Sequence, residues 1–417
     1  MGVENNIAEG WGKYSIGDFG KIITGKTPSK NNPEDWGDKI DFITPSDIPN
    51  NLKVISNCVR KLSEQGENRF NRMILPSGSV IVTCIGSDMG KVVMNKNKSL
   101  TNQQINSIII NDTYSNEFIY YLLKRSHKVL RRAGEGSGST MPLLNKSHFE
   151  SLSFEIPPLP EQKAIAKVLT AFDDKIELLQ AQNKTLETMA QTIFKEWFGK
   201  YQIGDDLPDG WRFGKLGEIA NLKSGYAFKS NDFVEENDKK ALKIKDLKGD
   251  GKVSLKNVSC VSDDITKLSR VQYFKLKEGD IVLAMSGNTT GKIGVTPPHS
   301  NEVYLNQRVG KFFMIKRELN SFLFTFLMSG NYEEKILSMG YGSAQPNVSP
   351  SLIENIDIIY PNEHKLLAFL NISDPIFNKV LDNNAQVRSL TRTRDTLLPK
   401  LMSGQVRVNN IKQPADA

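Results

Sequence analysis

The chain has 417 residues, too many for one hydrophobic core, and its 39% content of hydrophobic residues can fill the cores of two or more domains. Its 54 lysines and arginines exceed its 47 acidic residues, and the net charge of +7 favours a polyanionic partner without establishing one. Cys58, Cys84 and Cys260 stand far apart, which argues against a disulfide framework and a cysteine zinc site. No apolar run approaches the roughly 20 residues that span a bilayer, and the amino-terminal residues do not resemble a secretion signal. We therefore expect a cytoplasmic protein without membrane association.

Taken in chain order, the first half begins at Trp11 with a short strand-like segment and a basic loop that contains glycine. From Leu75 onward, the sequence LPSGSVIVTCIGSDMGKVVM predicts an apolar strand, a tight turn and a second strand. A glycine- and serine-rich loop ends at Pro142, and an extended, proline-marked segment follows from Phe154. A heptad pattern then runs from Ile165 to Trp197, which predicts a helix of roughly 48 Å.

The second half repeats this order at an offset of about 200 residues. Trp211 corresponds to Trp11, and LKEGDIVLAMSGNTTGKIGV from Leu276 corresponds to the hairpin of the first half. A second heptad pattern runs from Phe369 to Leu401. We expect an α+β fold with a pseudo-twofold internal repeat. Its expected parts are α/β domains at residues 1–157 and 201–361, helical spacers at residues 158–200 and 362–408, and a tail at residues 409–417.

The narrow apolar stripes of the two heptad patterns predict that the long helices pack on each other as an antiparallel coiled coil. In the register that places Asn183 opposite Asn383, nearly all other layers are apolar on both sides. Such an amide layer can fix the register at some cost in stability, because sliding would leave each amide facing hydrocarbon. The alternative is that each helix packs only on its own domain.

Motifs for catalysis are not recognisable in this sequence. The segments GSDMGK at Gly86 and GNTTGK at Gly287 are one residue short of a phosphate-binding P-loop and lack its final Ser or Thr, so a hairpin turn explains them better. An amino-methyltransferase needs an Asn/Asp-Pro-Pro-aromatic loop, and the nearest segment, TPPH from Thr296, differs at its first and last residues. The four histidines are scattered without metal-ligand spacing. We expect no catalytic residue, metal site or cofactor in this chain.

Polar and basic residues recur on glycine-punctuated loops of both halves, and such side chains contact phosphates and base edges in DNA-binding proteins. The candidate DNA-contact residues are Lys26, Thr27, Ser29, Lys30, Lys91, Gln103, Gln104, Ser137 and Ser139 in the first half, and Tyr226, Lys229, Lys292, Gln307, Arg308 and Gln345 in the second. Any one of them alone is more simply explained as a solvated turn residue. Their recurrence favours the group, although common descent of the two halves would also produce it.

The sequence resembles the specificity subunits of type I restriction–modification systems over essentially the whole chain. The resemblance is carried by PPLPEQKAIAKVLTAFDDKIELLQ from Pro157, by RDTLLPKLMSGQVRV from Arg394 and by the hairpin that occurs twice. It implies two target-recognition domains that each read half of a bipartite site in double-stranded DNA, with the paired helices setting the spacer. The second helix departs from the first, with NEHK where the first has PEQK.

The resemblance also implies partners. Two methyltransferase subunits would dock on this chain, and restriction–translocase subunits would join them in defence of the host against foreign DNA. Those partners would carry out methylation and cleavage and would bind S-adenosylmethionine, ATP and magnesium, so this chain itself would be no enzyme.

Two other functions remain open on the sequence alone. A two-module coiled-coil interaction protein would need no nucleic acid, and an enzyme fused to a recognition half would need the methyltransferase loop that is absent. Co-purification of a methyltransferase and salt-sensitive DNA binding would distinguish the specificity subunit from both.

Overall fold

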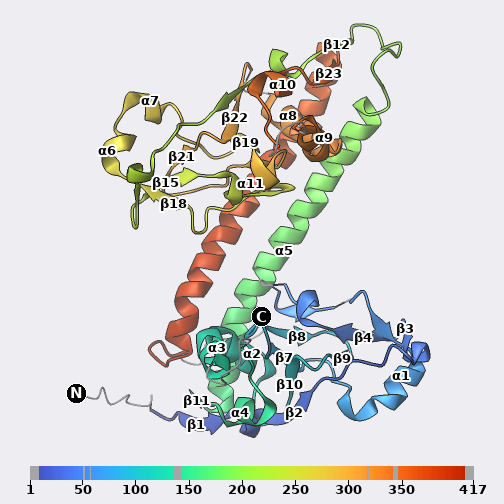
Figure 1. Cartoon of the computed structure of the whole chain (residues 1–417), viewed down its shortest axis with the longest axis vertical. Coiled ribbons are helices and arrows are strands. Elements are labelled where there is room, and N and C mark those ends of the chain that lie inside the picture. The colour runs from blue at the N-terminus through green and yellow to red at the C-terminus, as the bar shows by residue number, and fades with distance from the viewer. Residues whose placement is uncertain are drawn as a thin grey trace, which may run out of the picture. The chain divides into compact units, whose positions relative to one another are not determined.

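The computed structural model of the protein describes residues 9–49, 52–56, 58–135, 142–316, 319–340 and 346–408. The chain divides into two compact units, unit 1 with residues 1–175 and 390–417 and unit 2 with residues 176–389. Two long helices, α5 (Leu159–Phe198, green) and α11 (Glu363–Leu401, red), contribute to both units (Figure 1). The expected α+β fold is confirmed, and among the described residues no helix is long and apolar enough to cross a membrane.

Unit 1 contains a mixed five-stranded sheet, a four-stranded sheet, a strand pair and four short helices; we call this part domain 1. The five-stranded sheet has the order β2 (Gly20–Thr24), β10 (Ile105–Ile110), β7 (Val80–Thr83), β8 (Val92–Asn95), β5 (Val54–Ile55). The four-stranded sheet has the order β3 (Trp36–Gly37), β6 (Lys61–Leu62), β4 (Ile40–Ile43), β9 (Ser99–Thr101). The remaining elements are the pair β1 (Gly12–Ser15) and β11 (Ser153–Ile156), and the helices α1 (Glu64–Arg69), α2 (Asn116–Arg125), α3 (His127–Glu135) and α4 (Lys146–Ser151).

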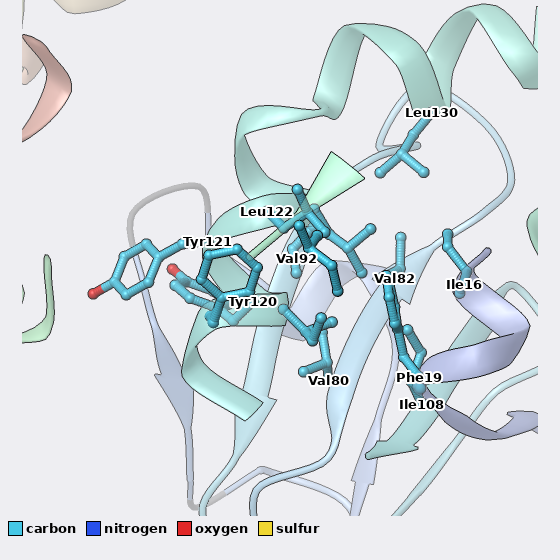
Figure 2. Close-up of a cluster of buried hydrophobic side chains, with 14 of the residues drawn as sticks. Ile16, Phe19, Val80, Val82, Val92, Ile108, Tyr120, Tyr121, Leu122 and Leu130 are labelled. Atoms are coloured by element: carbon cyan, nitrogen blue, oxygen red, sulfur yellow. The ribbon is translucent and has the colours of Figure 1, made fainter. Parts of the chain in front are cut away.

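The five-stranded sheet of domain 1 is covered on both faces, which explains why β7 is apolar without alternation. Successive side chains of a strand point to opposite faces. Val80 and Val82 join the cluster that contains α2, whereas Ile81 packs in a second cluster on the other face. Figure 2 shows the strand side chains lying against Tyr120 and Leu122 of α2. Each such fully buried side chain contributes roughly 1.5–3 kcal/mol to stability.

Unit 2 contains the equivalent domain 2, with the same kinds of elements. Its six-stranded sheet has the order β13 (Ala220–Ser224), β22 (Val309–Met314), β19 (Ile281–Ala284), β20 (Ile293–Val295), β17 (Gly251–Val253), β16 (Leu247–Gly249). Its four-stranded sheet has the order β14 (Phe233–Val234), β18 (Ser259–Val261), β15 (Lys239–Leu242), β21 (Glu302–Leu305). The pair β12 (Arg212–Lys215) and β23 (Asp357–Tyr360) and the helices α6 (Asp263–Thr266), α7 (Ser269–Gln272), α8 (Asn320–Ser329), α9 (Tyr332–Met339) and α10 (Pro350–Glu354) complete it.

The two domains share one topology. In the larger sheets, β7 and β19 each pair antiparallel with both neighbouring strands. In the smaller sheets, β4 pairs parallel with β9, and β15 pairs parallel with β21. The internal repeat that the sequence predicts is therefore a repeat of structure.

The start of α5 is anchored by two neighbouring residues of the segment PPLPEQ. Gln162 is buried, donates from Nε2 to the carbonyl of Pro157 at 2.9 Å and accepts from the amide of Ser115 at 3.0 Å. Glu161 accepts two hydrogen bonds, at 2.7 and 2.8 Å, from the guanidinium of Arg407. The two sequence segments that carry the family resemblance therefore meet in unit 1.

The start of α11 is held differently. There, Oδ1 of Asn362 accepts from the amide of Lys365 at 2.9 Å, and Nδ2 of Asn362 donates to the carbonyl of Asp209 at 3.1 Å. This is a side-chain cap of the helix amino terminus. The departure of NEHK from PEQK is thus a change in how the helix begins.

Within unit 2, α5 and α11 run antiparallel and meet at an amide layer. Nδ2 of Asn383 donates to Oδ1 of Asn183 at 2.8 Å, and Nδ2 of Asn183 donates to Oδ1 of Asn384 at 2.9 Å. Asn183 is 6% exposed and Asn383 is fully buried. The structure therefore brings together the two amides that the heptad pattern pairs.

The ends of the long helices pack on the domains as well as on each other. In unit 2, Phe194 and Phe198 are buried against Phe322 and Phe369, with ring centroids 5.3 to 5.8 Å apart for the Phe198–Phe369, Phe194–Phe322 and Phe322–Phe369 pairs. In unit 1, Ile165 and Leu169 lie in the core cluster that includes α2. The long helices therefore pack both on each other and on the domains, although on the sequence alone we treat these two packing modes as alternatives.

Candidate nucleic-acid interface

The candidate contact residues of domain 1 gather around the turn that joins β7 to β8. Gly86 and Gly90 have φ angles of +82° and +87°, which glycine adopts without steric cost. The amide of Gly86 donates to the carbonyl of Pro142 at 3.0 Å, and the amide of Cys84 donates to the carbonyl of Gln104 at 2.8 Å. These bonds place Pro142 and the β9–β10 turn beside the hairpin turn, at one edge of the domain.

Domain 2 repeats this backbone arrangement at the turn between β19 and β20. Gly287 and Gly291 have φ angles of +75° and +88°. The amide of Gly287 donates to the carbonyl of Pro346 at 3.0 Å, and the amide of Met285 donates to the carbonyl of Arg308 at 3.0 Å. In both domains, the same backbone hydrogen bonds therefore bring together the hairpin turn, the loop proline and the turn before the last strand of the larger sheet; we call this arrangement the loop edge. The side chains on the loop edge differ between the domains.

In domain 1, the loop after β2 and the β9–β10 turn present polar side chains to solvent. Lys26, Thr27, Ser29 and Lys30 are all exposed, as is Gln103. Oγ1 of Thr27 donates to Oε1 of Gln103 at 2.7 Å. Because this bond uses the amide oxygen, the Nε2 group of Gln103 keeps its donor capacity for another partner.

Lys91 and Gln104 are less available than the sequence suggests. Nζ of Lys91 lies 2.9 Å from the carboxylate of Asp88 and donates to the carbonyl of Ile48 at 3.1 Å. Oε1 of Gln104 accepts from Nδ2 of Asn102 at 3.0 Å. Both side chains therefore hold the loops together.

In domain 2, Gln307 and Arg308 are exposed at the β21–β22 turn. They border a hollow of about 770 Å³ whose other lining residues include Ser224, Asn347 and Ser349. The hollow thus combines amide, hydroxyl and guanidinium groups, which suits hydrogen bonding to base edges and phosphates.

Tyr226 lies next to this group, because its carbonyl accepts from the amide of Gln307 at 2.9 Å. Its ring packs on Phe228 at 5.0 Å between centroids, and the guanidinium of Arg270 lies 5.8 Å from the ring centroid. Lys229 is exposed.

Lys292, the counterpart of Lys91, is only partly exposed. Its backbone carbonyl accepts from the amide of Ala284 at 2.9 Å, which closes the hairpin of domain 2.

Ser137, Ser139 and Gln345 lie outside the described residues. Asn347 and Ser349 were not predicted from the sequence. The signal for them was present in the proline that recurs in both halves, since the carbonyl of Pro346 accepts from the amide of Gly287 in the hairpin turn and places the residues after it at the same edge.

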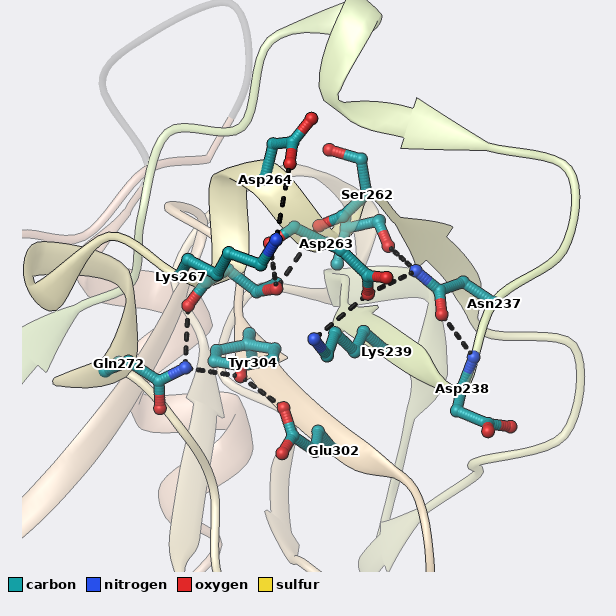
Figure 3. Close-up of polar contacts among 12 residues, drawn as sticks. Asn237, Asp238, Lys239, Ser262, Asp263, Asp264, Lys267, Gln272, Glu302 and Tyr304 are labelled. Carbon is teal, nitrogen blue, oxygen red and sulfur yellow. Dashed lines mark hydrogen bonds and ion pairs between the residues drawn. The ribbon is translucent and has the colours of Figure 1, made fainter.

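Polar and charged residues in and around the smaller sheet of domain 2 contact one another (Figure 3). Nζ of Lys239 lies 3.0 Å from the Asp263 carboxylate, and the hydroxyl of Tyr304 donates to Glu302 at 2.6 Å. Hydrogen bonds from Lys275 and Tyr304 hold the pKa of Glu302 below its usual range. These groups therefore already have hydrogen-bond or ion-pair partners within the domain.

A polar cluster that the sequence did not predict joins domain 1 to the long helices within unit 1. The hydroxyl of Tyr121 on α2 donates to Asp173 on α5 at 2.6 Å, and Asp173 also pairs with Arg394 on α11 at 2.5 Å. Burial, together with the Asp173 charge, raises the pKa of Tyr121, so the hydroxyl stays protonated and can donate. In the sequence, Arg394 only interrupts an apolar stripe; in the structure it has a largely buried ionic partner.

Comparison with known proteins identifies the family. A family model described as the type I restriction modification DNA specificity domain matches residues 8–188 and 208–372. The chain is 29% identical, over 97% of its length and 95% of the relative, to the specificity subunit of the type I restriction enzyme MjaIX of Methanocaldococcus jannaschii. The MjaVIII specificity subunit of the same organism is 27% identical over the same shares of both chains.

A solved structure has the same fold. The crystal structure of the S subunit of a type I restriction–modification system from M. genitalium matches with a TM-score of 0.60 at 19% identity, covering 96% of this chain and 98% of that one. The family model matches most of the chain in two consecutive segments, which correspond to the two structural repeats. The protein therefore belongs to the family of type I restriction–modification DNA specificity subunits.

Proposed function

We propose that this chain selects the bipartite DNA site at which a type I restriction–modification complex acts, with domain 1 (residues 1–157) reading one half-site and domain 2 (residues 201–361) the other. One observation carries the proposal: the two loop edges share a hydrogen-bonded backbone framework but expose different side chains. Thr27 and Gln103 stand on one edge, and Gln307 and Arg308 on the other. One scaffold with two sets of side chains is suited to reading two different sequences.

The exposed groups suggest how each half-site is read. A glutamine amide can bond bidentately to adenine, and an arginine to guanine, and each good pair discriminates by roughly 1–3 kcal/mol. Gln103, Gln307 and Arg308 are the residues we assign to base contacts. Lys26 and Lys30 would bind phosphates, which position the domain without reading sequence.

Catalysis belongs to partners in this proposal. Two methyltransferase subunits and the restriction–translocase subunits, acting in the cytoplasm, would use S-adenosylmethionine, ATP and magnesium. This chain supplies binding and orientation. The paired helices set the spacing between the half-sites, and the length of α5, 40 residues or about 60 Å, supports this role because it exceeds one duplex turn of about 34 Å.

Methylome sequencing with and without the gene tests the proposal directly. A bipartite methylation motif should disappear when the gene is removed. Gln103→Ala should relax one half of the motif and Gln307→Ala the other, whereas Gln202→Ala, an exposed glutamine outside the loop edges, should change neither. A motif that persists without the gene, or variants that alter the same half, would contradict the proposal.

A second experiment tests the spacing role. Inserting seven residues into each long helix lengthens it by about 10 Å, or about 3 base pairs, and should lengthen the spacer accordingly with both half-sites unchanged. Failure to bind DNA and to co-purify with a methyltransferase would instead favour the two-module interaction protein.

A further inference from the structure

Helix α3 of domain 1 has a basic outer face. It begins at His127, and its sequence HKVLRRAGE places Lys128 and Arg132 one turn apart. Both are exposed, whereas Leu130 and Gly134 are buried on the opposite side of the helix. The helix is thus fixed to the domain by a small apolar face and presents its cations to solvent.

The charges of Lys128 and Arg132 are not neutralised within the described part of the chain. Arg131 pairs with Glu135 at 3.2 Å, but neither Lys128 nor Arg132 has an ion-pair partner among the described residues. The segment between α3 and Pro142, GSGSTM, contains no acidic residue that could pair with them. Two cations on one exposed face therefore remain for an external anion.

This face belongs to a helix that packs on the candidate DNA-contact edge. A Cβ placed on Gly90 of the hairpin turn would lie 2.9 Å from the His127 ring, and one on Gly134 would lie 2.5 Å from the Met89 side chain. Both ends of α3 are therefore in close contact with the turn between β7 and β8. Phosphates flanking bases at that edge would lie near the helix.

Helix α9 of domain 2 lacks these charges. The amide of Leu143 donates to the carbonyl of Gly134 in α3, and the amide of Asn347 donates to the carbonyl of Gly340 at the end of α9. Because these two bonds are equivalent, Gly134 corresponds to Gly340, and the other residues of the two helices can be aligned by counting from them. In this alignment, Glu334 takes the place of Lys128, and Ser338 takes the place of Arg132. Glu334 and Ser338 are also exposed, so the positions are equivalent and only the charge differs.

We propose that Lys128 and Arg132 bind backbone phosphates of the DNA beside the half-site read by domain 1, and that the equivalent face of α9 makes no such contact. This inference rests on the proposed DNA-reading function and adds that the two domains contribute unequally to salt-dependent affinity. The partner follows from charge complementarity and from proximity to the loop edge. A contact to phosphates positions the protein and carries no sequence preference.

The salt dependence of binding by the assembled complex tests the proposal. The logarithm of the binding constant falls with the logarithm of salt concentration by about 0.9 per phosphate contact. K128Q/R132Q should therefore lower this slope by about 2, so that between 50 and 200 mM salt it loses about 12-fold less affinity than the wild type. The half-site preference should be unchanged.

The matched control is K163Q/K167Q, which removes two exposed lysines at the same helical spacing on α5 and should leave the slope unaltered. The graft E334K/S338R should raise the slope by transferring the cations to domain 2. An unchanged slope for K128Q/R132Q, or a change in sequence preference in place of slope, would overturn the inference. If the wild-type complex itself shows no preference for the methylated motif, the proposed function fails, which is a distinguishable result.

Discussion

The amide layer between α5 and α11 makes a prediction whose size can be worked out. Asn383→Ala removes the Nδ2 donor that lies 2.8 Å from Oδ1 of Asn183. That oxygen would then lack this partner in a layer where Asn183 is only 6% exposed. A buried polar atom left unpaired costs about 1–3 kcal/mol, so the free energy of unfolding of unit 2 should fall by about 2 kcal/mol.

Replacing both amides should have the opposite outcome. Leucine branches at the same carbon as asparagine, and exchanging both partners of a buried hydrogen bond for apolar groups of similar shape is often neutral or stabilising. Asn383 also has a buried Oδ1 for which no partner is found among the described residues, and the exchange would remove that cost. N183L/N383L should thus be at least as stable as the wild type, although the stripe would lose the amide layer that penalises a shift by one heptad.

Urea unfolding can be monitored by hydrogen exchange in peptides that cover residues 176–198 of α5. Because these residues belong to unit 2, this measurement reports on unit 2 alone. With a denaturant slope of about 3 kcal/mol per molar, a loss of 2 kcal/mol moves the midpoint down by about 0.7 M. The reasoning would be refuted by a wild-type midpoint for Asn383→Ala, or by a double variant that loses as much stability as the single one.

Three further predictions concern other buried contacts. Arg394→Leu should lower the free energy of unfolding of unit 1 by about 3 kcal/mol in chemical denaturation, because Asp173 stays largely buried without its ionic partner. Burial raises the pKa of Glu187, so Glu187→Gln should stabilise unit 2 at pH 7, where the wild type must keep a charged carboxylate in a largely desolvated place. Below the ordinary pKa of 4.5 the wild-type carboxyl is protonated in both the folded and the unfolded state, so the stability difference should vanish there, as thermal melts at several pH values would show. Gly291→Ala should cost at least about 2 kcal/mol in thermal unfolding, because its φ is +88° and a Cβ would lie 2.2 Å from the carbonyl oxygen of Glu333.

Each of these three changes has a matched control in the chain. Arg392→Leu and Glu177→Gln alter exposed residues on the same helices and should have little effect. Gly204→Ala tests the backbone effect alone, since φ is +98° there and no atom lies within 4 Å of a Cβ. A variant that behaves like its control would show that the buried contact does not contribute as argued.

Much of the fold could be predicted because its signals are local or periodic. The repeat of the hairpin, the glycines at its turn and the heptad spacing of the long helices all appear in the sequence itself. The pairing of Asn183 with Asn383 could also be predicted, because a polar side chain at an apolar heptad position is buried in the helix interface and needs a polar partner on the facing helix.

The apolar stripe of α5 was less predictable near its end. The heptad pattern points to Ile193 and Trp197, but Phe194 and Phe198 are the buried residues there. A straight α-helix drifts by about 20° per heptad, and the helix end packs on a domain as well as on α11. Heptad spacing therefore no longer predicts which side chains are buried where the helix changes its packing partner.

By itself, the sequence determined the duplicated α+β architecture, the two antiparallel helices and the family, because these depend on spacing along the chain. Only the tertiary structure decided which polar side chains are available to DNA. Lys91 and Gln104 turn toward neighbouring loops, whereas Gln103, Gln307 and Arg308 stay exposed. The reason is physical: a polar side chain is equally suited to bonding its own fold or an external ligand, and only its three-dimensional neighbours determine which of the two it does.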